Sequence, residues 1–337
     1  MPENQSRHVV ITGASAGAGR AAAVAFGRRG WKVSLIARGR AGLEGARADV
    51  NRAGGSALAI PADVADADAV EAAAMQAENA HGPIDVWVNC AMVTVFGPVS
   101  QVTPEEFRRV TEVTYLGQVH GTMSALRRMR SANRGTIVNV GSALAYHGLC
   151  LQAAYCGAKF AVRGFTEALR SELIHERSRV RLSFVVLPAL DTPQFDWARN
   201  KLLERPRPVA PVHDPEVAAE AILQATRFAP RELAVAGSSL QVMAGSAVMP
   251  GYLDRKLAGL GWSGQMTGEP AVDRPDNLFT PVDEEKDFGV RGRFGQGARR
   301  KAAMVPASAA RAVATAAAAL PVGLVFARLL LGKNRRH

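Results

Sequence analysis

Residues 8–20 read HVVITGASAGAGR, an apolar run that leads directly into a glycine-rich turn. The run itself, residues 8–12, has the length of a buried strand, and residues 20–29 favour a helix. Glycines in such a turn let the backbone bend sharply and approach a pyrophosphate, whose charge the free N–H groups of the helix then bind. A glycine-rich turn alone is equally consistent with a simple tight connection. Its position between a strand and a helix, at the start of an alternating chain, favours the phosphate-binding interpretation.

Apolar runs of strand length alternate with longer Ala-rich segments of helical period over the first 236 residues. Six further strands are expected, at residues 32–37, 56–61, 85–89, 135–140, 180–187 and 232–236. Thr103 and Pro104 are typical of a helix start, and that helix is expected to run to about residue 129, with another over residues 153–177. The pattern predicts an α/β fold, a doubly wound (Rossmann-type) parallel sheet of about seven strands with helices on both faces.

The alternation stops after Gly237, and the composition then divides the chain into three regions. Residues 1–237 are expected to form the α/β domain that contains the glycine-rich turn. Residues 238–290, rich in Gly, Pro and polar side chains, are expected to form an irregular C-terminal extension. Residues 291–337 are expected to form a basic linker and an Ala-rich tail helix.

The formal net charge of +11 is concentrated in the tail. From residue 288 to the end there are ten Lys and Arg and no Asp or Glu, whereas residues 1–287 carry 31 basic and 30 acidic side chains. The body is therefore nearly neutral, which argues against a nucleic-acid partner.

The tail is open to two interpretations. Residues 312–327 carry no charge and would span about 24 Å as a helix, short of a hydrocarbon core of about 30 Å. Binding at the surface of an anionic membrane is easier, because basic residues flank this segment at 299–301 and 333–336. The alternative is an Ala-rich helix packed on the body or on a partner subunit, or a frayed tail.

The three cysteines, Cys90, Cys150 and Cys156, have no paired spacing. This argues against a disulfide framework and against a metal site. The N-terminus is polar and has no secretory signal, so we expect a cytoplasmic protein. Under the membrane hypothesis for the tail, the protein would be peripheral at the inner face of a membrane.

Ser142 and the pair Tyr155 and Lys159 form the pattern with the most specific chemistry. Residues four apart on a helix share a face, so the Tyr155 hydroxyl and the Lys159 ammonium group can converge on one point. A free tyrosine has a pKa near ~10, and a nearby cation favours the phenolate. Ser142 follows a predicted strand and would enter the same crevice at the carboxyl ends of the strands. Tyr-x-x-x-Lys occurs by chance on many helices, but together with Ser142 and the glycine-rich turn it indicates an acid–base site.

Taken together, these motifs resemble those of the short-chain dehydrogenase/reductase family over residues 7–236. The resemblance is carried by Thr12 with the Gly-x-x-x-Gly-x-Gly turn, by Asp63-Val64, by Asn89-Cys90-Ala91, and by Ser142, Tyr155 and Lys159. It implies an oxidoreductase that interconverts a carbonyl and an alcohol through hydride transfer with a nicotinamide cofactor. It also implies that Tyr155 is the general acid/base, Lys159 its pKa modulator and ribose anchor, and Ser142 the group that orients the substrate.

The resemblance further implies a set of cofactor-binding residues: Gly13, Ser15, Gly17, Gly19, Arg38, Asp63, Val64, Asn89, Ala91, Tyr155, Lys159, Pro188 and Thr192. At the end of the second strand an acidic side chain would hold the ribose diol of NAD, but this sequence has Ala37-Arg38. Arg38 can pair with a 2′-phosphate through charge-assisted hydrogen bonds, so NADP(H) is the expected cofactor. The alternative is a solvated surface arginine.

Several positions depart from the family pattern. Thr114 stands where the family has an Asn that holds a water between Lys159 and solvent, which makes it a weak catalytic candidate. Cys90, Met92 and Ala189 replace an Asn and two Gly of the family. These departures favour an alternative function, a cofactor-binding scaffold or sensor with little turnover that is tethered by its tail. Retention of Ser142, Tyr155 and Lys159 together favours the enzyme.

The substrate end of the crevice is expected to be mostly apolar. Its predicted lining residues are Ser142, Leu144, His147, Leu149 and Trp197. Such a lining predicts a small to medium, hydrophobic substrate. The resemblance also implies a homo-oligomer, and no metal is expected.

Overall fold

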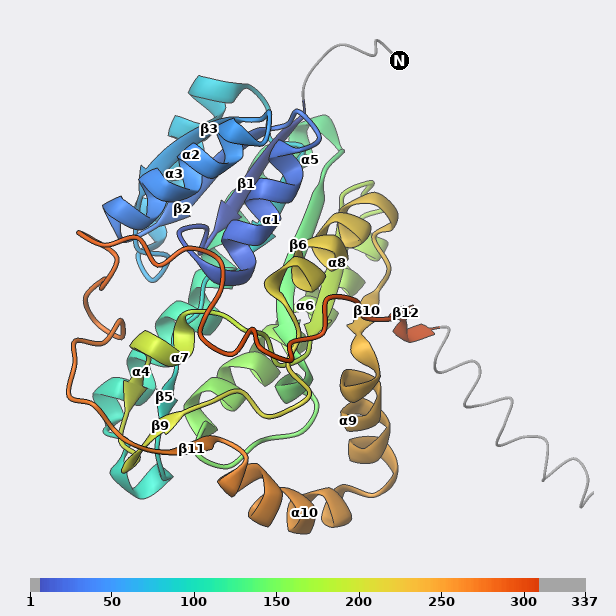
Figure 1. The fold of residues 1–337 in the computed structure, drawn as a ribbon. Coiled ribbons are helices and arrows are strands. Elements are labelled where there is room, and N and C mark those ends of the chain that lie inside the picture. Colours follow the sequence, from blue (N-terminus) through green and yellow to red (C-terminus); the bar gives the residue numbers. More distant parts are fainter. Residues whose placement is uncertain (1–6, 309–337) are drawn as a thin grey trace, which may run out of the picture.

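The structure of the protein is a computed structural model that describes residues 7–308 (Figure 1). Its centre is an eight-stranded sheet in the order β12-β10-β7-β6-β4-β1-β2-β3. Seven of the strands are parallel, which confirms the doubly wound α/β fold: β1 (His8–Thr12), β2 (Lys32–Ala37), β3 (Ser56–Pro61), β4 (Val86–Asn89), β6 (Thr136–Ser142), β7 (Arg181–Leu187) and β10 (Glu232–Val235). The eighth, β12 (Met304–Pro306), pairs antiparallel with β10 and was not predicted.

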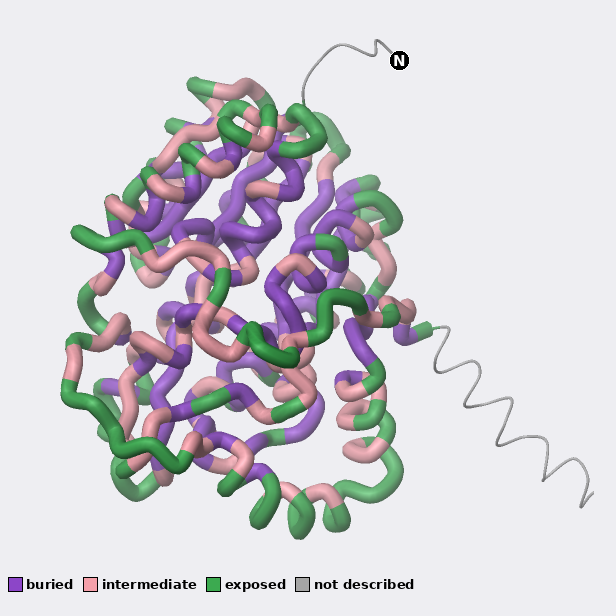
Figure 2. Tube along the Cα trace, viewed as in Figure 1, coloured by how far each residue is buried: buried purple, intermediate pink, exposed green. Residues whose placement is uncertain are grey.

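Helices cover both faces of the sheet. One face packs against α1 (Gly17–Gly27), α2 (Arg40–Arg52) and α8 (Pro215–Phe228). The other packs against α3 (Ala67–His81), α5 (Gly117–Ala132) and α6 (Ala153–His175). Figure 2 shows the result as a buried sheet between helices whose outer sides are exposed. Successive residues of a strand point to opposite faces, so Val9 and Ile11 belong to the first core and Val10 to the second.

The helix expected over residues 104–129 is divided into three parts. Thr103 and Glu106 form a capping box at the start of α4 (Pro104–Thr111), as the Thr-Pro pair predicts. A π-helical turn (Glu112–Leu116) then joins α4 to α5. Such a turn inserts extra backbone into a helix and often marks a functional position.

The chain after β10 is more regular than expected. Residues 238–290 were predicted to be irregular, but the structure has α9 (Ala236–Val248) and α10 (Pro250–Ser263) there. The prediction was wrong because it gave weight to Gly and Pro, whereas Pro250 stands at a helix start, where the missing N–H has no cost. α10 is largely exposed, whereas most residues of α9 are buried or half-buried (Figure 2).

The remaining elements are short and lie beyond the carboxyl ends of the parallel strands (Figure 1). They are β5 (Val95–Phe96), β8 (Arg199–Asn200), β9 (Glu204–Pro206), β11 (Met266–Pro270), α7 (Gln194–Trp197) and the 3₁₀ turns Val99–Gln101 and Ala143–Ala145. β9 pairs with β11, which ties the extension to the segment after β7, and β5 pairs with β8.

The uncharged segment at residues 312–327, for which membrane binding was considered, lies outside the described residues. Within residues 7–308, no helix has the length and hydropathy needed to cross a membrane.

A buried polar network joins β4 to its neighbours. The Trp87 ring N–H donates to Asn89 Oδ1 at 2.8 Å, and Asn89 Nδ2 donates to Asn139 Oδ1 and Thr122 Oγ1, both at 2.9 Å. All of these side chains are fully buried. Buried amides need such partners, because an unpaired polar group in a core costs about 1–3 kcal/mol.

This network generates a stability prediction. Gly121 of α5 lies directly against it, so a methyl group there would overlap Asn89 Oδ1 and come within 2.7 Å of Trp87 Nε1. We expect Gly121→Ala to lower the free energy of unfolding by about 1–3 kcal/mol in urea denaturation. The matched control is Gly164→Ala, an exposed position of α6 with open space around it, which should raise that free energy by about 0.5–1 kcal/mol. Equal stability of the two variants would show that the network tolerates the methyl group.

Candidate active site

The strand order reverses between β1 and β4, and this reversal opens a crevice at their carboxyl ends. Gly13 follows β1 with φ +69°, and a Cβ there would lie 2.6 Å from the Cα of Ala91, which follows β4. Only glycine fits this approach. Gly17 also has a positive φ, +55°, at the start of α1. The loop therefore has the close-packed, N–H-rich form that can hold a pyrophosphate.

A cleft of about 370 Å³ extends from this loop toward the extension. It is lined by most of the residues predicted for the cofactor and the substrate: Gly13, Ser15, Gly17, Gly19, Arg38, Asp63, Val64, Ala91, Ser142, Leu144, His147, Leu149, Tyr155, Lys159, Pro188, Thr192 and Trp197. Two predicted residues, Asn89 and Thr114, do not line it. Asn89 belongs instead to the buried polar network described above.

Tyr155, Lys159 and Ser142 meet in the middle of the cleft. Tyr155 and Lys159 lie one turn apart on α6, and Ser142 ends β6. Ser142 Oγ accepts a 3.1 Å hydrogen bond from the Leu144 N–H and lies beside the Tyr155 hydroxyl. Lys159 Nζ lies 5.6 Å from the centre of the Tyr155 ring and donates a 2.8 Å hydrogen bond to the Val140 carbonyl. A substrate oxygen beside Tyr155 would thus face two hydroxyls, with an ammonium group close behind them.

Burial controls the ionisation of this trio. It lowers the pKa of Lys159 to about 8, with the neighbouring Cys90 thiol opposing that shift. Burial also raises the pKa of Tyr155 above its usual value, and the hydrogen bond from Ser142 opposes the rise. The sequence led us to expect that Lys159 would lower the pKa of Tyr155, but in the protein alone the desolvation of the phenolate is the larger effect. A protonated Tyr155 suits the donation of a proton to a carbonyl oxygen.

Thr114 does not lie in a position to serve the trio. Its fully buried hydroxyl donates to the Val93 carbonyl at 2.9 Å and accepts from the Val93 N–H at 3.0 Å. Gln118, one turn along α5, is closer to the chemistry, because its Nε2 donates at 3.1 Å to the Val140 carbonyl that also accepts from Lys159. Within residues 7–308, Gln118 Oε1 is buried without a hydrogen-bond partner. No motif in the sequence pointed to Gln118.

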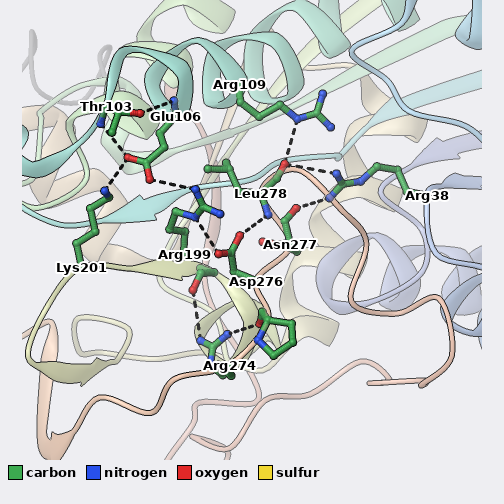
Figure 3. Close-up of polar contacts among 12 residues, drawn as sticks. Arg38, Thr103, Glu106, Arg109, Arg199, Lys201, Arg274, Asp276, Asn277 and Leu278 are labelled. Carbon is green, nitrogen blue, oxygen red and sulfur yellow. Dashed lines mark hydrogen bonds and ion pairs between the residues drawn. The ribbon is translucent and has the colours of Figure 1, made fainter.

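Arg38 lies at the other end of the cleft, where the 2′-phosphate was expected. Its guanidinium donates to the backbone carbonyls of Asn277 and Leu278 (3.4 Å) in the C-terminal extension (Figure 3). It also donates to the Phe279 carbonyl at 3.0 Å. Burial lowers the pKa of Arg38, and the charge of Asp63 opposes that shift. Arg38 is therefore a partly buried, oriented cation and not a solvated surface arginine.

Asp63, the predicted adenine contact, forms an ion pair with Arg109. Burial on its own would raise the pKa of Asp63, but the hydrogen bond from Arg109 and that from the Ala65 N–H outweigh burial and lower it. Arg109 also donates to the Leu278 carbonyl at 3.0 Å (Figure 3). The carboxylate is thus ionised and held at the edge of the cleft.

Residues 276–295 form a C-terminal strap that runs past the N-terminal ends of α1 and α2 (orange to red in Figure 1). Asp287 of the strap pairs with the buried Arg20 of α1. The Gly289 carbonyl accepts from the Gly17 N–H at 3.2 Å, and the Phe294 N–H donates to the buried Asp191 carboxylate at 2.8 Å. The sequence pattern did not predict this strap, because it is held by backbone groups and single ion pairs that have no periodicity.

The extension also builds the substrate end of the cleft. Ser238 and Val242 of α9 and Leu257 of α10 line it, together with a loop over residues 207–211. His147 is held between these helices by Asp254 at 3.2 Å and Ser246 at 3.4 Å. The far end of the cleft is therefore completed by a region for which the sequence pattern predicted no structure.

Comparison with known proteins agrees with this geometry. The short chain dehydrogenase family matches residues 7–202. The oxidoreductase YxnA of Bacillus subtilis is 31% identical over 273 residues, which is 80% of this chain and 77% of that protein. The 3-dehydrosphinganine reductase of Danio rerio is 35% identical over 193 residues, which is 56% of this chain and 58% of that enzyme.

A probable oxidoreductase, EphD of Mycobacterium tuberculosis, is 36% identical over 187 residues, 55% of this chain and 31% of that protein. The family match includes the glycine-rich loop and Ser142, Tyr155 and Lys159, and the match to YxnA covers most of the length of both chains. This chain therefore belongs to the short-chain dehydrogenase family of oxidoreductases.

Proposed function

We propose that the protein is an NADP(H)-dependent oxidoreductase that interconverts a carbonyl and an alcohol on a hydrophobic substrate. The observation that carries the proposal is the convergence of Ser142, Tyr155 and Lys159 between the glycine-rich loop and an apolar chamber. Nicotinamide cofactors are used throughout this family, and the close-packed loop from Gly13 to Gly19 fits a pyrophosphate.

In the proposed mechanism, a bound nicotinamide supplies or accepts the hydride. Tyr155 transfers its hydroxyl proton to the substrate oxygen during reduction and takes it back during oxidation. Ser142 donates a hydrogen bond that orients the same oxygen. Lys159, fixed by the Val140 carbonyl, places a positive charge close to the phenolate that forms when Tyr155 gives up its proton. Pro188 and Thr192 would hold the nicotinamide end of the cofactor, and Asp63 and Val64 the adenine end.

The apolar chamber supports a hydrophobic substrate. Its lining includes Leu144 of the 3₁₀ turn, Leu149 of the loop that follows, Val242 of α9 and Leu257 of α10. Because this chain is similar to a 3-dehydrosphinganine reductase, 3-dehydrosphinganine is a suitable first substrate for an assay. Smaller hydrophobic aldehydes and ketones should be assayed beside it. From the sequence we also propose that the tail associates with a membrane surface and that the chain forms a homo-oligomer.

The competing function is a cofactor-binding scaffold or sensor with little turnover. Oxidation of NADPH by the full-length protein, measured against a panel of hydrophobic carbonyl compounds, separates the two functions. Tight NADPH binding without turnover of any member of the panel would favour the scaffold.

Tyr155→Phe tests the proposed mechanism directly. The change removes only the transferable proton, so we expect loss of turnover by about a hundredfold or more, with nearly unchanged NADPH affinity. Tyr252→Phe is the matched control, because Tyr252 is exposed on α10 and should have no role in proton transfer. Equal turnover of Tyr155→Phe and the parent at neutral pH contradicts the assignment.

Lys159→Met tests the cost of the buried cation. Because the pKa of Lys159 is lowered to about 8, the folded state holds a charge that burial disfavours at neutral pH. The variant should lose activity but gain about 1–3 kcal/mol in free energy of unfolding at pH ~7. As the pH rises through about 8, the folded parent releases this proton before the unfolded chain does, so the parent gains stability and the difference shrinks. A difference that stays constant from neutral pH to about pH 10 would contradict the shift.

Arg38→Gln tests the cofactor preference. The change removes the positive charge, and we expect the dissociation constant for NADPH to rise by about tenfold or more, with little change for NADH. Arg47→Gln, on the exposed side of α2, is the matched control and should alter neither constant. A parent that already binds NADH more tightly than NADPH would refute the NADP(H) assignment.

A further inference from the structure

Asp283 is a strap residue whose side chain turns inward. It is 8% exposed and lines the cleft together with Ser15 and Arg38. Its carboxylate lies against the N-terminal end of α2, in space left by two glycines. A Cβ at Gly39 would overlap Asp283 Oδ1, and a Cβ at Gly42 would lie 2.5 Å from Oδ2 and 2.9 Å from the Ser15 Cβ.

Backbone contacts fix Asp283 in this place. The Gly42 N–H donates to the Asp283 carbonyl at 3.0 Å, and the Ala41 N–H donates to the Glu284 carbonyl at 3.1 Å. The Arg40 N–H donates to the Glu284 carboxylate, also at 3.1 Å. These bonds satisfy the free N–H groups at the start of α2 without using the Asp283 carboxylate.

The carboxylate itself has no hydrogen-bond or ion-pair partner in the part of the chain that the structure describes, residues 7–308. Its oxygens are not sealed from solvent but reach the cleft, where a ligand can donate a hydrogen bond to them. Arg38 is close enough for the charge of Asp283 to act on it, since that charge helps to oppose the lowering of the pKa of Arg38 by burial.

The position of Asp283 is informative because of what β2 lacks. In dinucleotide folds an acidic residue at the end of this strand accepts hydrogen bonds from the ribose hydroxyls of NAD. Here β2 ends in Ala37 and is followed by Arg38, and the strap delivers a carboxylate to the same corner from a distant part of the chain. A carboxylate and a guanidinium thus lie at one end of the cleft with opposite preferences.

We propose that Asp283 is a specificity-determining residue that binds the adenosine ribose of the cofactor and limits the preference for NADP(H) created by Arg38. The proposal rests on the nicotinamide cofactor of the proposed function. A 2′-hydroxyl donates a hydrogen bond to the Asp283 carboxylate, whereas a 2′-phosphate is repelled by it and attracted by Arg38. The discrimination between the two cofactors is the difference between these effects.

The test is the isosteric variant Asp283→Asn in the full-length protein, with NADPH and NADH titrated separately by nucleotide fluorescence and without a substrate. Removing the negative charge should lower the dissociation constant for NADPH by about tenfold and raise that for NADH by a few fold. The matched control is Glu285→Gln, an exposed strap residue with the same change of charge, which should leave both constants as they are.

Opposite shifts of the two constants in Asp283→Asn, with parent values in Glu285→Gln, support the proposal. Unchanged constants, or shifts in the same direction for both nucleotides, overturn it and leave Asp283 as a structural residue of the strap. A loosened strap would weaken the binding of both nucleotides alike, and it would also lower the thermal unfolding temperature of the free variant. Because the readout is binding, a protein that turns over no carbonyl compound would refute the proposed reaction without affecting this result.

Discussion

The close approach of β1 and β4 is the constraint on which the rest of the site depends. The strand order reverses between these two strands, so the chain leaves β1 toward one face of the sheet and β4 toward the other. A crevice opens between the two connections. Gly13 makes this possible, because the backbone after β4 occupies the space where a side chain would lie. The glycine-rich loop, the end of β6 with Ser142 and the α6 pair Tyr155 and Lys159 all open into that crevice.

Burial shifts the pKa values of the site residues and also lowers the stability of the folded state. Lys159 is held in the core by one carbonyl bond, and its pKa falls to about 8 as a result. A group held in an unfavourable ionisation state is typical of functional positions, where stability is lost in favour of reactivity. The buried network around Asn89 reaches the helix that carries Tyr155 and Lys159, because Asn139 Nδ2 donates to Thr166 Oγ1 of α6 at 2.9 Å.

The C-terminal extension is part of the site and not an appendage. Its two helices close the apolar end of the cleft, and the strap reaches the glycine-rich loop, Arg38 and the start of α2. The buried guanidinium of Arg20 pairs with Asp287 and so holds the strap against α1. The cleft is therefore lined both by the family fold and by residues that follow it.

The sequence was enough to predict the doubly wound sheet and to place the glycine-rich turn, Ser142, Tyr155 and Lys159 at one crevice, because each prediction depends on local period and spacing. Alternating apolar runs specify strands, and a four-residue interval places Tyr155 and Lys159 on one helical face. The contacts of Thr114, Gln118 and Asp283 could be seen only in the folded chain. Thr114 donates a hydrogen bond to Val93, and Gln118 shares the Val140 carbonyl with Lys159. Asp283 lines the same end of the cleft as Arg38. Such contacts join residues that are distant in the chain through single hydrogen bonds and shape, and these leave no periodic signal in the sequence.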